Sequence, residues 1–129
     1  MLKFTDFIID CPDPMALAAF YSGVTGQPLG ARSTGDWAYL TFGDIDLAFY
    51  RVEHYRPPTW PGDEHPKQYH LDFEVDEFAP EQQRVTALGA ELQREFIGPE
   101  GYGWQIYKDP VGHPFCLCRN KGYDWAGRG

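Results

Sequence analysis

Apolar and polar residues alternate in several short stretches of the chain, most clearly over residues 68–75 (QYHLDFEV). Because successive side chains of a β-strand point to opposite faces, this alternation predicts a strand with one packing face and one polar face. The packing face would carry Leu71, Phe73 and Val75, and the polar face His70, Asp72 and Glu74. Such a polar face either lines a site or faces solvent, and the pattern leaves both interpretations open.

The first half of the chain predicts a strand, a helix and then further strands. Alternation over residues 3–11 predicts the strand, Asp13 is a favourable helix N-cap, and Pro14 suits the first helical position. We expect this helix to end at Gly26. Two or three short strands are expected over residues 30–52, where aromatic and aliphatic residues lie between Gly-Asp turns.

A proline-rich segment over residues 57–66 predicts a linker, because proline lacks the N–H that helices and sheets use. The pattern of the first half then starts again. It predicts a strand, a helix and three more strands, at residues 68–75, 80–88, 91–96, 103–108 and 114–119.

The two halves also match in spacing. Gly26 follows Asp13 by 13 positions, and Gly89 follows Asp76 by 13 positions. Since each half is too small to bury its own sheet, we expect an α+β fold of two βαβββ modules packed together in one domain. The expected boundaries are module one at 1–56, linker at 57–66, module two at 67–120 and a C-terminal tail at 121–129.

The amino-acid composition limits the kinds of molecule that the protein is expected to bind. The formal net charge of −8 and the lack of clustered Lys and Arg argue against nucleic acid and anionic membrane surfaces, so we expect a small-molecule ligand. No apolar run approaches the length of a membrane span and no signal-peptide pattern precedes the first strand, which favours a cytoplasmic protein. The cysteines Cys11, Cys116 and Cys118 are expected to be reduced and buried.

Four motifs resemble the glyoxalase-like branch of the vicinal oxygen chelate superfamily, the glyoxalase, bleomycin-resistance and extradiol-dioxygenase group. They are DCPDP at 10–14, PPTWP at 57–61, HLDFEVD at 70–76 and DPVGHPFCL at 109–117. The resemblance extends over most of the chain. It implies two βαβββ modules whose sheets form one cup around the ligand, and it implies a homodimer.

Metal-dependent members of that superfamily hold an ion with four ligands, one on the first and one on the last strand of each module. Carried over by position, these ligands become His70, Asp6 and Cys116, while the fourth lands on Ala48 or Tyr50, which are not carboxylates. A divalent metal ion at Asp6, His70 and Cys116 is therefore one interpretation. Because this ligand set is unusual, we favour the other interpretation, a site without a resident cofactor.

Without a metal, the resemblance still implies a cup for a flat or partly apolar molecule. We expect His70 to be its catalytic residue, as metal ligand or as general acid or base, with Asp6 or Asp72 orienting it. The expected ligand-binding residues are Asp72, Tyr50, Trp37, Tyr39 and Trp104. His113 is expected to be a turn residue.

The expected function is that of a glyoxalase-like protein, a lyase or isomerase acting on a small oxygenated molecule. The incomplete ligand set argues against glyoxalase I itself. The alternative is a protein without catalysis that binds or sequesters a small molecule, as drug-resistance members do, and the acidic composition would suit a cationic ligand. The fold alone does not separate an enzyme from a binding protein.

Overall fold

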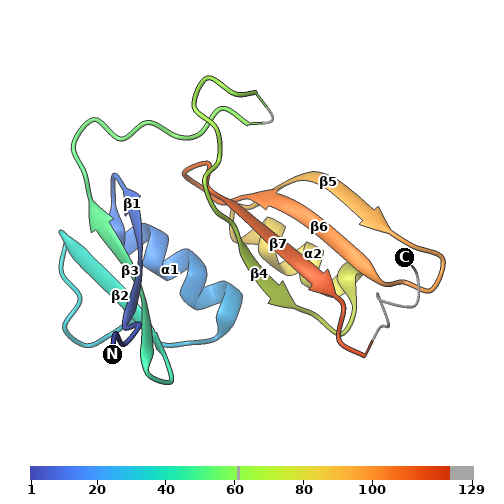
Figure 1. Ribbon diagram of the computed structural model, residues 1–129, viewed down its shortest axis with the longest axis horizontal. Coiled ribbons are helices and arrows are strands. Elements are labelled where there is room, and N and C mark those ends of the chain that lie inside the picture. The colour runs from blue at the N-terminus through green and yellow to red at the C-terminus, as the bar shows by residue number, and fades with distance from the viewer. Residues whose placement is uncertain (61, 123–129) are drawn as a thin grey trace. The chain divides into compact units, whose positions relative to one another are not determined.

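The computed structural model describes residues 1–60 and 62–122, and the chain divides into two compact units, Met1–Pro57 and Pro58–Gly129 (Figure 1). Each unit contains one sheet and one helix, which confirms the predicted α+β organisation in two modules. Most of the predicted tail at 121–129 lies outside the described residues. No described helix has both the length and the apolar composition needed to cross a membrane.

The first unit is a three-stranded sheet with one helix. Its elements are β1 (Asp6–Cys11), α1 (Pro14–Thr25), β2 (Trp37–Phe42) and β3 (Ile45–Arg51). The strand order is β1-β3-β2, with β1 parallel and β2 antiparallel to β3. Helix α1 packs on this sheet through Tyr21, which is fully buried and whose ring stacks on that of Phe49 with centroids 5.6 Å apart.

Helix α1 begins and ends where the sequence predicts. The side chain of Asp13 accepts a hydrogen bond of 3.2 Å from the N–H of Ala16, and Pro14 occupies the first helical turn. At the other end Gly26 adopts a left-handed conformation with φ of 79°, and its N–H donates to the carbonyl of Ser22. This conformation strains residues that have a Cβ, so glycine ends the helix here.

The first unit has one strand fewer than a βαβββ module. Between α1 and β2 the chain runs beside β2 without forming a ladder, touching it through the bond from Gly30 N–H to the carbonyl of Tyr39. The Tyr39 ring lies over Gly30 so closely that an added Cβ would be 2.2 Å away. A turn closed by Ser33 N–H and the Gly30 carbonyl then bends the chain. The segment therefore makes isolated backbone hydrogen bonds to β2 and no continuous ladder.

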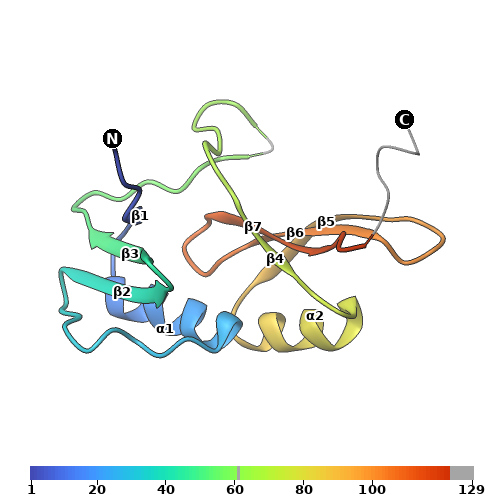
Figure 2. The same ribbon diagram turned by 60° about the horizontal axis from the view of Figure 1, so that its bottom comes forward.

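The second unit is a complete βαβββ module. Its elements are β4 (Leu71–Glu74), α2 (Phe78–Ala87), β5 (Glu91–Ile97), β6 (Gly103–Lys108) and β7 (Pro114–Arg119). The strand order is β4-β7-β6-β5, with β4 parallel to β7 and the other pairs antiparallel. Figure 2 shows α2 covering one face of this sheet and leaving the other face without a helix.

The face of the second sheet toward α2 holds the core of the unit. Phe115 and Tyr107 are fully buried and stack with ring centroids 5.2 Å apart. The Tyr107 hydroxyl donates to Gln105, whose amide nitrogen donates to Gln82 of α2 and to Glu95 of β5. Burial, with the nearby charge of Glu95, raises the pKa of Tyr107, so this hydroxyl stays a hydrogen-bond donor.

Two predicted boundaries in the second unit were wrong. The strand predicted at 68–75 forms only over Leu71–Glu74. In register, His70 would lie opposite Pro114, which has no N–H to donate, so the ladder starts one residue later. Helix α2 begins at Phe78 after Glu77, not at the predicted position 80, and no side chain caps it.

We expect Asp13→Ala to lower the free energy of unfolding by about 1 kcal/mol, because it removes the side-chain acceptor for Ala16 N–H. Glu77→Ala is the matched control, since Glu77 holds the same position at α2 without making a cap bond. That change is expected to stay within about 0.5 kcal/mol. Urea unfolding followed by circular dichroism measures both variants, and equal losses would contradict the capping role of Asp13.

Candidate functional site

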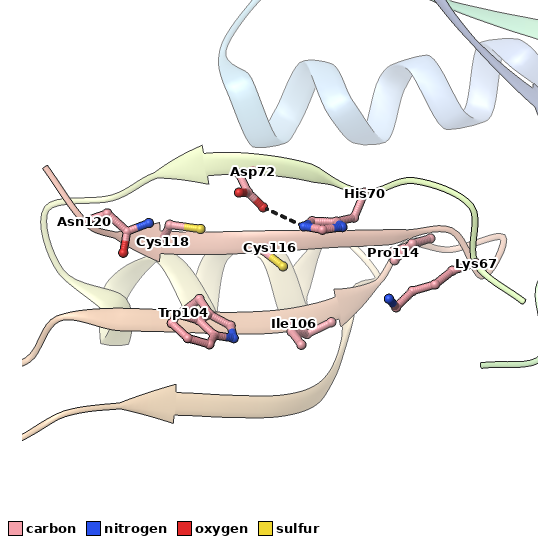
Figure 3. Close-up of a pocket in the computed structure, with 9 residues that line it drawn as sticks. All are labelled: Lys67, His70, Asp72, Trp104, Ile106, Pro114, Cys116, Cys118 and Asn120. Carbon is pink, nitrogen blue, oxygen red and sulfur yellow. Dashed lines mark ion pairs between the residues drawn. The ribbon is translucent and has the colours of Figure 1, made fainter. Parts of the chain in front are cut away.

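A pocket of about 220 Å³ lies on the face of the second sheet opposite α2, which we call the open face (Figure 3). Its walls come from β4, β6 and β7 and from the chain that flanks them. The lining residues are Lys67, His70, Asp72, Trp104, Ile106, Pro114, Cys116, Cys118 and Asn120. The candidate site therefore belongs entirely to the second unit.

The strand register explains which side chains meet on the open face. Asp72 of β4 pairs with Cys116 of β7, and Cys116 pairs with Ile106 of β6. Two residues further along β7, Cys118 pairs with Trp104. Since every second residue of a strand faces the same way, the two cysteines and their partners form neighbouring rows across the sheet. The alternation predicted for 68–75 puts Asp72 on this face, and the exposure pattern confirms it.

His70 and Asp72 form the polar pair of the pocket. The Nε2 atom of His70 lies 3.4 Å from Oδ1 of Asp72, and about half of each side chain is exposed (Figure 3). The carboxylate can accept a hydrogen bond from the Nε2–H group and hold the imidazole in one orientation. The other ring nitrogen, Nδ1, is then the one available to a ligand.

The two thiols beside this pair are buried and protonated at neutral pH. Cys116 and Cys118 are each 5% exposed. Burial raises the pKa of Cys116 to about 12, and the negative charge of Asp72 adds to the shift. Burial and Asp72 likewise raise the pKa of Cys118 to about 12. Because the thiolate is the reactive form, neither cysteine is set up as a nucleophile.

The site contains a set of atoms that could hold a metal ion. One ligand atom each from His70, Asp72 and Cys116 lies within 4.8 Å of the others. Imidazole nitrogen, carboxylate oxygen and thiolate sulfur are all zinc ligands, so the donor types fit a zinc-like ion. Because the thiolate is the form that binds a metal, Cys116 would first have to lose its proton, and its raised pKa disfavours that step.

Two further residues shape the end of the pocket near the end of β7. The carboxylate of Glu74 accepts hydrogen bonds from the backbone N–H groups of Asn120 and Lys121, so this acid holds the chain after β7. The Oδ1 atom of Asn120 is buried and has no hydrogen-bond partner among the described residues. A ligand hydroxyl or N–H would satisfy it.

The other predicted site residues lie in the first unit. Asp6 is on β1 and Tyr39 is on β2, where its hydroxyl accepts a hydrogen bond from Arg32 N–H. The rings of Trp37 and Tyr50 contact each other edge to face, with centroids 6.1 Å apart. A ligand-binding role for Trp37, Tyr39 and Tyr50, and a metal-binding role for Asp6, stay predictions.

The turn before β7 holds His113 as predicted. The carboxylate of Asp109 accepts hydrogen bonds from the N–H groups of Val111 and His113, and Gly112 has a φ of 95°. The indole N–H of Trp60 donates to the Gly112 carbonyl, so the linker is tied to this turn. His113 is thus a turn residue of the second unit, outside the pocket lining.

Several pocket residues were missed from the sequence. Cys118 shares the face of Cys116 by simple alternation, so its position was available from the pattern. Lys67 stands at the end of the linker and Asn120 follows the last strand, where alternation no longer indicates a direction. Only the three-dimensional contacts place these two side chains in the pocket.

We expect the raised pKa of Cys116 and Cys118 to slow alkylation by iodoacetamide. In the folded protein their labelling should increase with pH up to about 12, whereas in the unfolded chain it should level off above about 9. Asp72→Asn removes the nearby negative charge, lowers the pKa of both thiols and speeds their labelling. Peptide mass spectrometry measures each cysteine separately.

Asp76→Asn is the matched control for the cysteine experiment, because Asp76 is exposed beyond the end of β4. Labelling of Cys11, which is buried in the first unit, reports any general loosening of the protein. If Asp72→Asn left the labelling of both Cys116 and Cys118 unchanged, Asp72 would have no electrostatic influence on the thiols.

Comparisons with known proteins bear on the family and the fold of the chain. The family model described as a glyoxalase-like domain matches residues 6–118. A search of curated proteins finds no significant match.

Solved structures share the fold over nearly the whole chain. A glyoxalase-related enzyme from Fulvimarina pelagi is 20% identical, with a TM-score of 0.68 over 93% of this chain and 89% of its own. A glyoxalase/bleomycin resistance protein/dioxygenase family enzyme from Burkholderia phytofirmans PsJN is 17% identical, with a TM-score of 0.71 over 92% of this chain and 98% of its own. A lactoylglutathione lyase from Agrobacterium tumefaciens is 20% identical, with a TM-score of 0.63 over 95% of this chain and 97% of its own. The chain therefore belongs to the glyoxalase-like domain family.

Proposed function

We propose that this protein is a glyoxalase-like enzyme that acts on a small oxygenated molecule bound on the open face of the second sheet. The reaction is of the lyase or isomerase type, in which a proton leaves a carbon beside a carbonyl group. The observation that supports this most is the contact of 3.4 Å between His70 Nε2 and Asp72 Oδ1 in the wall of a pocket. A histidine held by a carboxylate is a common general base.

In this proposal His70 transfers the proton, and Asp72 holds the His70 side chain in position. With Nε2–H directed at Asp72, the unprotonated Nδ1 takes the proton from the substrate carbon and later returns it to another atom. The charge that the imidazole gains is stabilised by the Asp72 carboxylate. The buried Cys116 thiol stays neutral and forms part of the wall, because its pKa of about 12 disfavours a nucleophilic role.

The remaining pocket residues suit substrate binding. Trp104 is partly exposed and contacts the Phe96 ring at 5.3 Å between centroids, which gives an aromatic surface for a flat molecule. Asn120 offers an acceptor oxygen for a hydroxyl group of the substrate. An apolar surface with few polar anchors is typical of small-molecule sites.

A zinc-like ion is an alternative occupant of the same side chains, and it would be held by His70, Asp72 and Cys116. Such an ion would polarise a substrate oxygen. Native mass spectrometry of protein purified without added metal checks this arrangement. A bound ion that is lost in Cys116→Ser and kept in Cys118→Ser would support it, and protein without stoichiometric metal after dialysis against zinc would exclude it.

We expect His70→Gln to slow proton abstraction strongly while leaving ligand binding largely intact. The measurement is NMR of α-oxo and α-hydroxy carbonyl compounds incubated with the protein in D2O, where abstraction exchanges deuterium into the substrate. Loss of one general base should slow exchange by about a hundredfold or more. Binding is followed in parallel through shifts of protein resonances.

His65→Gln is the matched control, because His65 is an exposed linker histidine outside the pocket lining. Its exchange rate should equal that of the unmodified protein. If His70→Gln exchanged deuterium at the normal rate, His70 would not be the base. If the unmodified protein bound compounds without exchanging any of them, the sequestering alternative would replace the enzyme proposal.

A further inference from the structure

A second hollow adjoins the candidate site on the same unit. It has a volume of about 450 Å³, within the range of roughly 300–1,000 Å³ that is usual for ligand pockets. Lys67 and Ile106 line both hollows, so the two share a wall. In Figure 3 Lys67 lies at the end of the first pocket that is farther from Asn120, and Ile106 lies between Lys67 and Trp104. The other residues of the second hollow are Trp60, Gly62, Pro66, Gln93 and Arg94.

The charge of this second hollow is opposite to that of the whole chain. The protein has 19 acidic against 11 basic residues, yet the two charged side chains in the lining are Lys67 and Arg94. In the described ranges, 1–60 and 62–122, no carboxylate belongs to the lining. At its margin the Nζ atom of Lys108 lies 5.3 Å from the centroid of the Trp60 ring, and Lys108 pairs across the sheet with Glu91 of β5. The positive charges of Lys67 and Arg94 in the lining attract an anion.

The two charged side chains of the second hollow are not engaged in ion pairs, unlike two other arginines of this protein. Arg51 pairs with Asp36, and Arg84 pairs with Glu81. Among residues 1–60 and 62–122, neither Lys67 nor Arg94 forms an ion pair. The guanidinium of Arg94 therefore keeps its donors for a ligand, and its planar fork matches the oxygens of a carboxylate or phosphate.

We propose that the substrate carries an anionic group, a carboxylate or a phosphate, which binds between Lys67 and Arg94. This inference rests on the proposed function. Its oxygenated end then lies beside His70, because Lys67 lines both hollows. This assignment defines the substrate as a small organic anion and not as the cation that the overall charge would suggest. Lys67 and Arg94 bind the anion, and His70 and Asp72 perform the chemistry.

The test compares the affinity of anionic compounds with that of matched neutral compounds. The pairs are pyruvate with methyl pyruvate, and dihydroxyacetone phosphate with dihydroxyacetone, titrated into the full chain and followed by NMR at constant ionic strength. We expect one anion to bind at least about tenfold more tightly than its neutral partner. The carboxylate and phosphate pairs show which anion the hollow prefers.

Arg94→Gln and Lys67→Gln should each remove most of this preference, while binding of the neutral compounds stays the same. Arg84→Gln is the matched control, since Arg84 lies on α2 and pairs with Glu81, and it should leave the preference unchanged. Equal binding of anionic and neutral partners, or a preference that survives Arg94→Gln, would overturn the inference. Deuterium exchange of neutral compounds that depends on His70 would still stand in that case, so failure of the anion site is distinguishable from failure of the proposed function.

Discussion

The parallel pairing of β4 with β7 is the contact on which the second unit depends. It joins the first strand of the module to its last, and the helix and the two other strands lie between them in sequence. Because the pairing aligns Asp72 with Cys116, it places Asp72 beside the buried thiols and His70 at the end of the ladder. A shift of one residue would turn Asp72 toward α2 and bury its charge in the core. The same register therefore determines both the packing of the module and the composition of the open face.

On that face the carboxylate of Asp72 sets the chemistry of its neighbours. It contacts His70, and its charge contributes to the raised pKa of Cys116 and Cys118. The negative charge helps to keep both thiols protonated and therefore unreactive. In the proposed reaction the same side chain holds the imidazole of His70 in place.

Local patterns predicted much of this arrangement, because strand alternation and helix caps depend on neighbouring residues. The polar face of residues 68–75 and the start of α1 at Asp13 and Pro14 are examples. Over residues 30–52 the pattern left two or three strands open, and the structure forms two, β2 and β3. Asp72 and Cys116 were both expected in one cup, but their direct pairing was not predicted, because register between distant strands follows from tertiary contacts. Asp6, inferred from the family resemblance, remains a prediction.

The net charge of a protein and the local charge of its binding site affect different properties. The value of −8 describes long-range repulsion and solubility, and it argues against binding to nucleic acid. A ligand in a hollow interacts mainly with groups within a few ångströms, because water and salt screen the more distant charges. In the second hollow those groups include Lys67 and Arg94, and no carboxylate lines it in the part of the chain that the structure describes. An acidic protein can therefore hold an organic anion, and its remaining negative surface would disfavour anions elsewhere on the molecule.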